Sequence, residues 1–214
     1  LLNNAVTQDN LQSKLVVAVN ASGFVKNGSW GANYIKANPK FDMSSTSPLV
    51  LSKGKLIRDL SGGTLPTSVN KIYGMNKNGN LVYYTYPGGT KTEENKAVAQ
   101  KIINDGVLNT FAFKPILVYD GVLKSTSTDQ NIRQGLCKID KNNFVLVTDI
   151  YASARDGFSY SELGNYMISL GCKTGFNLDG GGSTSLIFKN KNSSAITITG
   201  NTRQIADIIY FQEQ

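Results

Sequence analysis

The feature that most constrains this chain is a run of three glycines directly after a carboxylate, in the sequence NLDGGGSTS at positions 177–185. Such a run is a poor continuation of either a strand or a helix, because glycine loses more backbone entropy on folding than any other residue. It follows a helical pattern that ends near Gly171 and precedes an apolar run at 186–188. A plain turn between two strands is the ordinary interpretation of such a run.

The residues around the glycines favour a second interpretation, a cradle for a polar ligand. Asn177 and Asp179 are two positions apart, so they share one side of a strand ending. The hydroxyl groups of Ser183 and Thr184 follow the glycines. Glycine leaves backbone N–H groups open to converge on a ligand. The stretch thus combines a carboxylate, an amide, open N–H groups and two hydroxyls.

Length and composition indicate a folded chain that forms one domain over residues 1–214. Hydrophobic residues make up 40% of the 214 residues and charged residues 17%, which is typical of a folded protein rather than a disordered one. No apolar segment approaches the length needed to cross a bilayer. Because the chain begins with Leu1 rather than Met, we expect a processed product or a part of a larger parent polypeptide.

The charge balance indicates the kind of partner. A net charge of +7 favours anionic partners such as phosphorylated sugars, teichoic-type polymers or nucleic acid. The lysines are scattered and form no continuous basic run, so nucleic acid is the weaker option. We therefore expect a sugar-phosphate or glycan substrate, and no nucleic-acid partner.

The chain contains no histidine, and this narrows the chemistry more than any motif does. It excludes histidine-based triads, imidazole zinc sites and phosphohistidine chemistry, and leaves carboxylates, tyrosine, lysine and arginine as proton carriers. The two cysteines, Cys137 and Cys172, allow either a disulfide or two small buried thiols. The sequence favours the buried thiols.

Short apolar runs separated by turn residues predict many short strands, largely joined as hairpins. They lie at 15–19, 49–51, 55–60, 71–75, 81–86, 110–119, 136–139, 144–150, 195–199 and 205–211. Residues 28–47, which include Trp30, Tyr34 and Phe41, read as a long loop.

Two helices complete the prediction. The first has Thr90 or Thr92 as its N-cap and ends at Gly106. The second begins with a capping box formed by Ser159 and Glu162, and it ends at Gly171. The sequence thus predicts an α+β fold, with a largely antiparallel or mixed β-sheet and two amphipathic helices packed on it.

The order of these motifs resembles the phosphodiester glycosidase family over nearly the whole chain. The motifs are AVNASGF at 18–24, RQG at 133–135, the helix at 159–171, NLDGGGS at 177–183, and Arg203. The resemblance implies hydrolysis of the bond between a sugar anomeric carbon and a phosphodiester, in an N-acetylglucosamine-1-phosphodiester or a cell-envelope glycan. Two departures from the family pattern leave the sugar open: Ala21-Ser22 replaces an asparagine- and glycine-rich stretch, and Gln134 replaces a small residue.

The resemblance and the chemistry together give a candidate site. Its candidate catalytic residues are Asp179 and Glu162, and its candidate substrate-binding residues are Asn20, Arg133, Asn177, Gly180, Gly181, Gly182, Ser183 and Arg203. A carboxylate would stabilise the oxocarbenium-like transition state. The phosphate leaves as a weak base, so one carboxylate with phosphate-binding cations could suffice without strong acid assistance. Arginines and converging N–H groups recognise a phosphodiester well.

Several of these residues have an ordinary structural alternative. The capping box explains Glu162 fully. For Asn20 the spacing favours a plain turn residue over an amide that faces the ligand. Arg133 and Arg203 would each make a surface ion pair equally well. Asp149 either lines the same cleft or turns the chain, with Tyr151 as a weak donor beside it.

No cofactor is predicted, although oxygens of Asp and Asn would also suit a divalent cation such as Ca²⁺ or Mg²⁺. The competing functional hypothesis is a non-catalytic carbohydrate- or teichoic-acid-binding module of a secreted or phage-tail protein. Both hypotheses predict an extracellular or cell-envelope location, including the surface of a virion.

Overall fold

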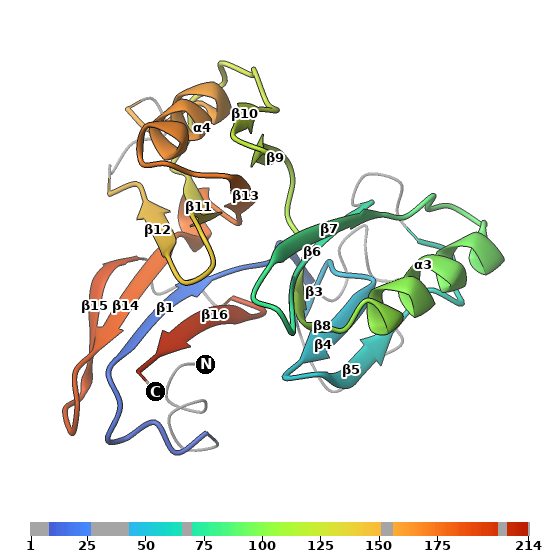
Figure 1. Ribbon diagram of the computed structural model, residues 1–214, viewed down its shortest axis with the longest axis horizontal. Coiled ribbons are helices and arrows are strands. Elements are labelled where there is room, and N and C mark those ends of the chain that lie inside the picture. Colours follow the sequence, from blue (N-terminus) through green and yellow to red (C-terminus); the bar gives the residue numbers. More distant parts are fainter. Residues whose placement is uncertain (1–8, 27–42, 66–69, 151–155, 201–204, 214) are drawn as a thin grey trace.

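The computed structural model describes residues 9–26, 43–65, 70–150, 156–200 and 205–213 (Figure 1). Within them the chain forms strands β1 to β16, helices α3 and α4, and a short 3₁₀ helix, η1 (Gly181–Ser183). Every strand pair in the five sheets is antiparallel. The predicted α+β class is confirmed. No helix among these residues is long and apolar enough to cross a membrane.

A four-stranded sheet brings the two ends of the described chain together, in the order β15-β14-β1-β16. Its strands are β1 (Val16–Asn20), β14 (Ser185–Lys189), β15 (Ala195–Gly200) and β16 (Ile208–Gln212). In β1, Val17 faces Phe188 on one side and Phe211 on the other. This sheet therefore holds Asn20, the last residue of β1, beside the start of β14.

A five-stranded sheet with the order β10-β9-β13-β11-β12 carries the other predicted motifs. Its strands are β9 (Ile116–Tyr119), β10 (Val122–Leu123), β11 (Gln134–Lys138), β12 (Phe144–Thr148) and β13 (Thr174–Leu178). The central strand β11 pairs Gln134 with Thr148 of β12 and with Leu178 of β13. The ends of these three strands therefore lie in one row.

Helix α4 (Tyr160–Ser169) packs on one face of this sheet. Its predicted capping box is confirmed, since the Ser159 hydroxyl accepts from the Glu162 N–H and the Glu162 carboxylate accepts from the Ser159 N–H. Gly135 of β11 lets the helix approach closely, because a Cβ there would lie 2.2 Å from Met167 Cε. Odd-numbered residues of β11 and β13 thus face α4.

A second group of strands, β4 to β8, lies with α3 on the other side of the molecule in Figure 1. It contains the hairpin β4 (Leu49–Ser52) and β5 (Lys55–Asp59), and the sheet β7-β6-β8 formed by β6 (Lys71–Asn76), β7 (Leu81–Thr85) and β8 (Val107–Phe111). The predicted strands 49–51 and 55–60 pair as a hairpin, and so do the predicted strands 71–75 and 81–86. The predicted loop 28–47 is wrong at its end, because β3 (Met43–Ser45) pairs with β2 (Phe24–Lys26). Its residues Trp30, Tyr34 and Phe41 lie outside the described residues.

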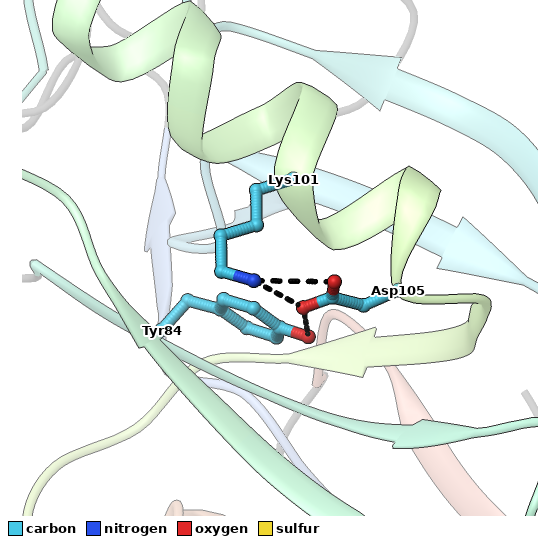
Figure 2. Close-up of polar contacts among 3 residues, drawn as sticks. All are labelled: Tyr84, Lys101 and Asp105. Atoms are coloured by element: carbon cyan, nitrogen blue, oxygen red, sulfur yellow. Dashed lines mark hydrogen bonds and ion pairs between the residues drawn. The ribbon is translucent and has the colours of Figure 1, made fainter.

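Helix α3 (Thr92–Asn104) is confirmed, but its predicted cap is wrong. The N-cap residue is Lys91, and neither threonine caps the helix with its side chain. A polar cluster holds its other end (Figure 2): Lys101 Nζ lies 2.9 Å from one Asp105 carboxylate oxygen, which also accepts from Tyr84 OH at 2.7 Å. The hydrogen bonds from Lys101 and Tyr84 lower the pKa of Asp105.

A shared core joins the two groups of strands. The ring of Tyr73 in β6 stacks on Phe176 in β13, with centroids 4.3 Å apart and planes at 10°. The buried residues of this cluster are Val19, Ala21, Tyr73, Leu81, Phe111, Leu136, Phe176 and Leu178. Lys138 adds a polar link, because its Nζ donates to the Gly79 carbonyl at 2.6 Å and to Asn80 Oδ1 at 2.7 Å. The β6–β7 turn is thereby held against β11.

The expectation of two free thiols is wrong, because Cys137 and Cys172 form a disulfide. Their Cα atoms are 5.7 Å apart and both residues are buried. Cys137 lies in β11 and Cys172 just beyond α4, and the strand and the helix come together only in the folded chain. Local sequence patterns carry no information on such a pairing.

Replacing both cysteines by alanine should lower the free energy of unfolding by about 2–4 kcal/mol, because the bridge closes a loop with a sequence separation of 35 in the unfolded chain. Urea unfolding of wild type and of the double variant, without reductant, measures the difference. Adding dithiothreitol should bring wild type close to the variant and leave the variant unchanged. Equal midpoints without reductant would contradict the prediction.

Candidate active site

Three charged residues follow one another across the ends of strands β12, β11 and β13. The last register pairs are Gln134 with Thr148 and Gln134 with Leu178, so the next row contains Asp149, Arg133 and Asp179. The backbone continues this row, since the Asp149 N–H donates to the Arg133 carbonyl at 2.9 Å. Alternation along the strands places Arg133 and Asp179 on the face that carries α4. An arginine thus stands between two aspartates in the backbone row at one edge of the sheet.

Arg133 is held against the start of α4. Its Nε donates to the Phe158 carbonyl at 3.3 Å, and an Nη donates to the Asp129 carbonyl at 3.0 Å. Its guanidinium carbon lies 3.7 Å from the centre of the Tyr160 ring, a cation–π contact. The side chain is 8% exposed. These contacts fix the plane of the guanidinium and leave some of its five donors for a ligand. Sequence reasoning missed the role of Tyr160, which no motif marks.

The glycine stretch is more ordered than a plain turn. The Gly181 N–H donates to the Ile132 carbonyl at 2.8 Å, and η1 begins at this residue. The Ser183 N–H donates to the Gly180 carbonyl at 3.0 Å. Of the three glycine N–H groups, those of Gly180 and Gly182 bond to no described residue. Only these two glycine N–H groups are therefore available to bind a ligand. Side chains are excluded here, since a Cβ on Gly180 would lie 2.4 Å from the Ile132 carbonyl oxygen.

Two buried side-chain amides hold both ends of this stretch. Asn20 Nδ2 donates to the Asp179 carbonyl at 2.6 Å, and its Oδ1 accepts from the Ser185 N–H at 2.8 Å. Gln134 Oε1 also accepts from that N–H at 3.2 Å, and its Nε2 donates to the Ser185 carbonyl at 3.3 Å. The turn interpretation of Asn20 is therefore wrong, because its amide bonds to residues far along the chain. The sequence marked Gln134 only as a departure from the family pattern.

Asn177 and Ser183 lie beneath the exposed surface of the site. Asn177 is fully buried, and its Nδ2 donates to the Lys114 carbonyl at 3.0 Å. Its Oδ1 is buried and accepts no hydrogen bond from any described residue, which is costly inside a protein. Ser183 is 3% exposed. Asp179 and the three glycines are half-buried, and they form the accessible part of the stretch.

Glu162 serves as the capping residue of α4. Its Oε2 accepts from the Ser159 N–H and from the Ser159 hydroxyl, both at 2.7 Å. These two bonds lower the pKa of Glu162, so it is ionised at neutral pH and holds no proton to donate. A catalytic role for Glu162 stays a prediction. As an ionised carboxylate it could act as a base or a nucleophile, and not as an acid.

The remaining candidates fall in two groups. Asp149 Oδ2 accepts from the Phe158 N–H at 3.0 Å, so this carboxylate helps to close the loop before α4. Arg203 and Tyr151 lie outside the described residues. The part of the chain that the structure describes contains no group of three or more acidic or cysteine residues arranged to hold a metal ion.

Comparison with known protein families agrees with the resemblance that the order of the motifs indicated. The family model described as phosphodiester glycosidase matches residues 13–212, and the chain belongs to this family. No curated protein matches the chain significantly.

Two solved structures resemble the fold. One is the catalytic domain of zebrafish N-acetylglucosamine-1-phosphodiester alpha-N-acetylglucosaminidase, auto-inhibited by its pro-peptide, with 16% identity and a TM-score of 0.56; the match covers 94% of this chain and 64% of that one. The other is a hypothetical protein from Synechocystis, with 14% identity, a TM-score of 0.48, and coverage of 97% and 52%. The chain therefore spans less than two thirds of either protein.

Asn20 and Gln134 should stabilise the fold in a coupled way, since both accept from the Ser185 N–H. Either single alanine variant leaves that N–H one acceptor, whereas the double variant leaves it none. We expect the double variant to lose more free energy of unfolding than the sum of the singles, by about 0.5–3 kcal/mol. Urea unfolding of all four proteins gives the coupling, and strict additivity would contradict a shared role.

Glu162→Gln should change how stability depends on pH. A carboxyl group whose pKa is lowered by folding stabilises the folded state above its ordinary value of about 4.3, and this contribution is lost as pH falls through the lower folded pKa. Glutamine can still accept the Ser159 N–H bond, so the cap survives without the charge. Wild type should therefore be the more stable protein at pH 7, with the difference in urea midpoint shrinking towards pH 3. A constant difference would contradict this assignment.

Proposed function

We propose that this domain hydrolyses the bond between a sugar anomeric carbon and a phosphodiester, and that Asp179 is the catalytic carboxylate. The observation that carries the proposal is the position of Asp179, one strand from Arg133 at the same edge of the sheet. Membership of the phosphodiester glycosidase family supports the reaction class.

The proposed chemistry requires little from the protein. Cleavage at an anomeric carbon passes through an oxocarbenium-like state that a nearby carboxylate stabilises, as a nucleophile or as the base for water. Breaking the bond between the anomeric carbon and the phosphate oxygen releases a phosphate monoester. This leaving group is a weak base, with a second pKa of about 6, so it departs without strong acid assistance. This suits a site whose second candidate carboxylate, Glu162, is ionised. The absence of histidine is no obstacle to such a mechanism.

Recognition of the phosphodiester is assigned to Arg133 and to the glycine stretch. The remaining donors of the Arg133 guanidinium and the N–H groups of Gly180 and Gly182 are suited to phosphate oxygens. Arg203 would add a second cation. Direct substrate contacts from Asn20, Asn177 and Ser183 remain predictions, and their burial favours support of the stretch over contact with the sugar.

The proposed substrates are N-acetylglucosamine-1-phosphodiesters or related cell-envelope glycans. The zebrafish protein of similar fold is an N-acetylglucosamine-1-phosphodiester alpha-N-acetylglucosaminidase. An extracellular or cell-envelope location is proposed with it, and the disulfide supports an oxidising compartment. No cofactor is required by this mechanism.

Asp179→Asn should abolish release of free sugar from two substrates, the methyl ester of N-acetylglucosamine-1-phosphate and UDP-N-acetylglucosamine. The fold should stay intact. A loss of about 10³-fold or more is expected for removal of an essential carboxylate. Free N-acetylglucosamine is measured with and without EDTA, and Asp156→Asn, an exposed aspartate nearby, is the matched control. Equal rates for wild type and Asp179→Asn would contradict the assignment.

The same experiment separates the alternative, a non-catalytic carbohydrate- or teichoic-acid-binding module. Such a module would bind the diester in a calorimeter without releasing sugar, and Asp179→Asn would change its affinity little. Sensitivity to EDTA would establish a divalent cation at the site.

A further inference from the structure

A groove runs along β12 beside α4 and meets the row of charged residues at Asp149. Its volume is about 600 Å³, and it is lined by Val145, Leu146, Val147, Thr148, Asp149, Ile150, Phe158, Tyr166 and Leu170. Six of these residues are consecutive. Because alternate side chains of a strand point to opposite faces, a space that touches six in a row must lie against the edge of the strand. One wall of the groove is therefore the backbone edge of β12.

This edge carries hydrogen-bonding groups that face away from the sheet. β12 is the terminal strand in the sheet order and pairs only with β11 among the described strands. The Asp149 N–H bonds to the Arg133 carbonyl, so odd-numbered residues of β12 bond to β11. In an antiparallel ladder the groups of the alternate residues then point outward. The N–H and carbonyl groups of Leu146 and Thr148 thus face the groove, and no described residue bonds to them.

The edge of β12 also lacks the usual protection against pairing. Edge strands are normally short, charged, interrupted by proline or bent by a bulge. β10 has two residues, β5 carries Lys55, Arg58 and Asp59, and β15 is offset by a bulge against β14. The edge strands β7 and β16 are uncharged like β12, so β12 is distinguished by the groove along its edge. The sequence of β12 is FVLVT, and its five pairs with β11 follow in unbroken register.

The opposite wall is apolar and open to solvent. Tyr166 and Leu170 are one helical turn apart and are 46% and 38% exposed. The ring of Phe158 stacks on Tyr166, with centroids 5.9 Å apart and planes at 19°. Ile150, at the end of β12, is 74% exposed. A strand edge and an apolar helix face thus border one continuous groove.

We propose that this groove binds an extended peptide segment, which adds a strand to β12 and places apolar side chains at alternate positions against Phe158, Tyr166 and Leu170. Strand addition supplies backbone partners for Leu146 and Thr148, and the groove selects the side chains. A lipid tail or a sugar would fill the apolar space but could not pair with the strand edge in register. The groove borders the candidate site at Asp149 but is not lined by Asp179 or Arg133, so its test does not depend on the hydrolysis assay.

The probe is a fluorescein-labelled synthetic peptide of alternating Val and Thr with a Lys at each end, titrated by fluorescence anisotropy. Two further peptides carry N-methyl groups on every Val or on every Thr. Only one of these alternate sets has N–H groups that face β12, so one methylated peptide should bind at least about tenfold more weakly and the other should bind like the parent. Equal binding of both methylated peptides would show apolar adsorption and overturn the proposal.

Two variants test the protein side. Thr148→Pro removes an outward N–H without touching a bond to β11, since proline is tolerated in an edge strand at such a position. Tyr166→Glu places a charge in the groove, with Tyr166→Phe as its conservative partner. Thr148→Pro and Tyr166→Glu should each weaken peptide binding about tenfold, and Tyr166→Phe should leave it unchanged. Far-ultraviolet circular dichroism and urea unfolding establish that the variants are folded.

The matched control is Ile196→Glu, which changes an exposed residue of another edge strand, β15. It should leave peptide binding unchanged. An equal loss with Ile196→Glu would mean nonspecific attraction to exposed apolar surface. Light scattering could instead show a stable dimer that Thr148→Pro dissociates and that the peptide does not affect. In that case the occupant of the groove would be a second copy of this chain. Either result overturns the proposal.

Discussion

The hydrogen bonds of two buried amides to the backbone of Asp179 and Ser185 are the interaction on which the site depends. Asn20 belongs to the four-stranded sheet and Gln134 to the five-stranded sheet. Because both reach the Ser185 N–H, the two sheets meet at the end of the glycine stretch. Glycines alone would leave this stretch with many conformations. The two amides, together with the hydrogen bond from the Gly181 N–H to the Ile132 carbonyl, restrict the conformation of this stretch.

The placement of α4 follows from a second constraint, the close approach of the helix to β11 and β13. Glycines at the contact points let the helix descend onto the sheet, and the disulfide fixes its far end. Its near end then carries Tyr160 over Arg133, and the Phe158 carbonyl accepts from the same guanidinium. The capping box of Ser159 and Glu162 thus orients the arginine indirectly, because it sets where the first turn of the helix begins.

Local patterns predicted the fold well, and long-range contacts could not be predicted. Hairpins and the capping box depend on neighbouring residues, so the strands, both helices and the α+β class could be recognised in the sequence. The partners of Asn20 lie 159 and 165 residues away, and the cysteine partner is 35 away. The error at the start of α3 has another cause: threonine is favoured as a cap, but here the turn before the helix bonds through its backbone. For the candidate site, motif order identified Arg133 and Asp179, whereas their adjacency required the register of the sheet.

The chemistry of the proposed substrate would allow so sparse a site to be sufficient. A glycoside with an alcohol leaving group needs a proton donor with a raised pKa, yet the second candidate carboxylate here has a lowered pKa. Cleavage of a sugar phosphodiester at the anomeric carbon releases a phosphate monoester as a stable anion, so the demand shifts from proton donation to recognition of negative charge. In the proposed function Arg133 would meet that demand with a permanent cation, one strand away from Asp179 at the same edge of the sheet. The lack of histidine and the ionised Glu162 are therefore consistent with one requirement, a leaving group that needs charge stabilisation more than a proton.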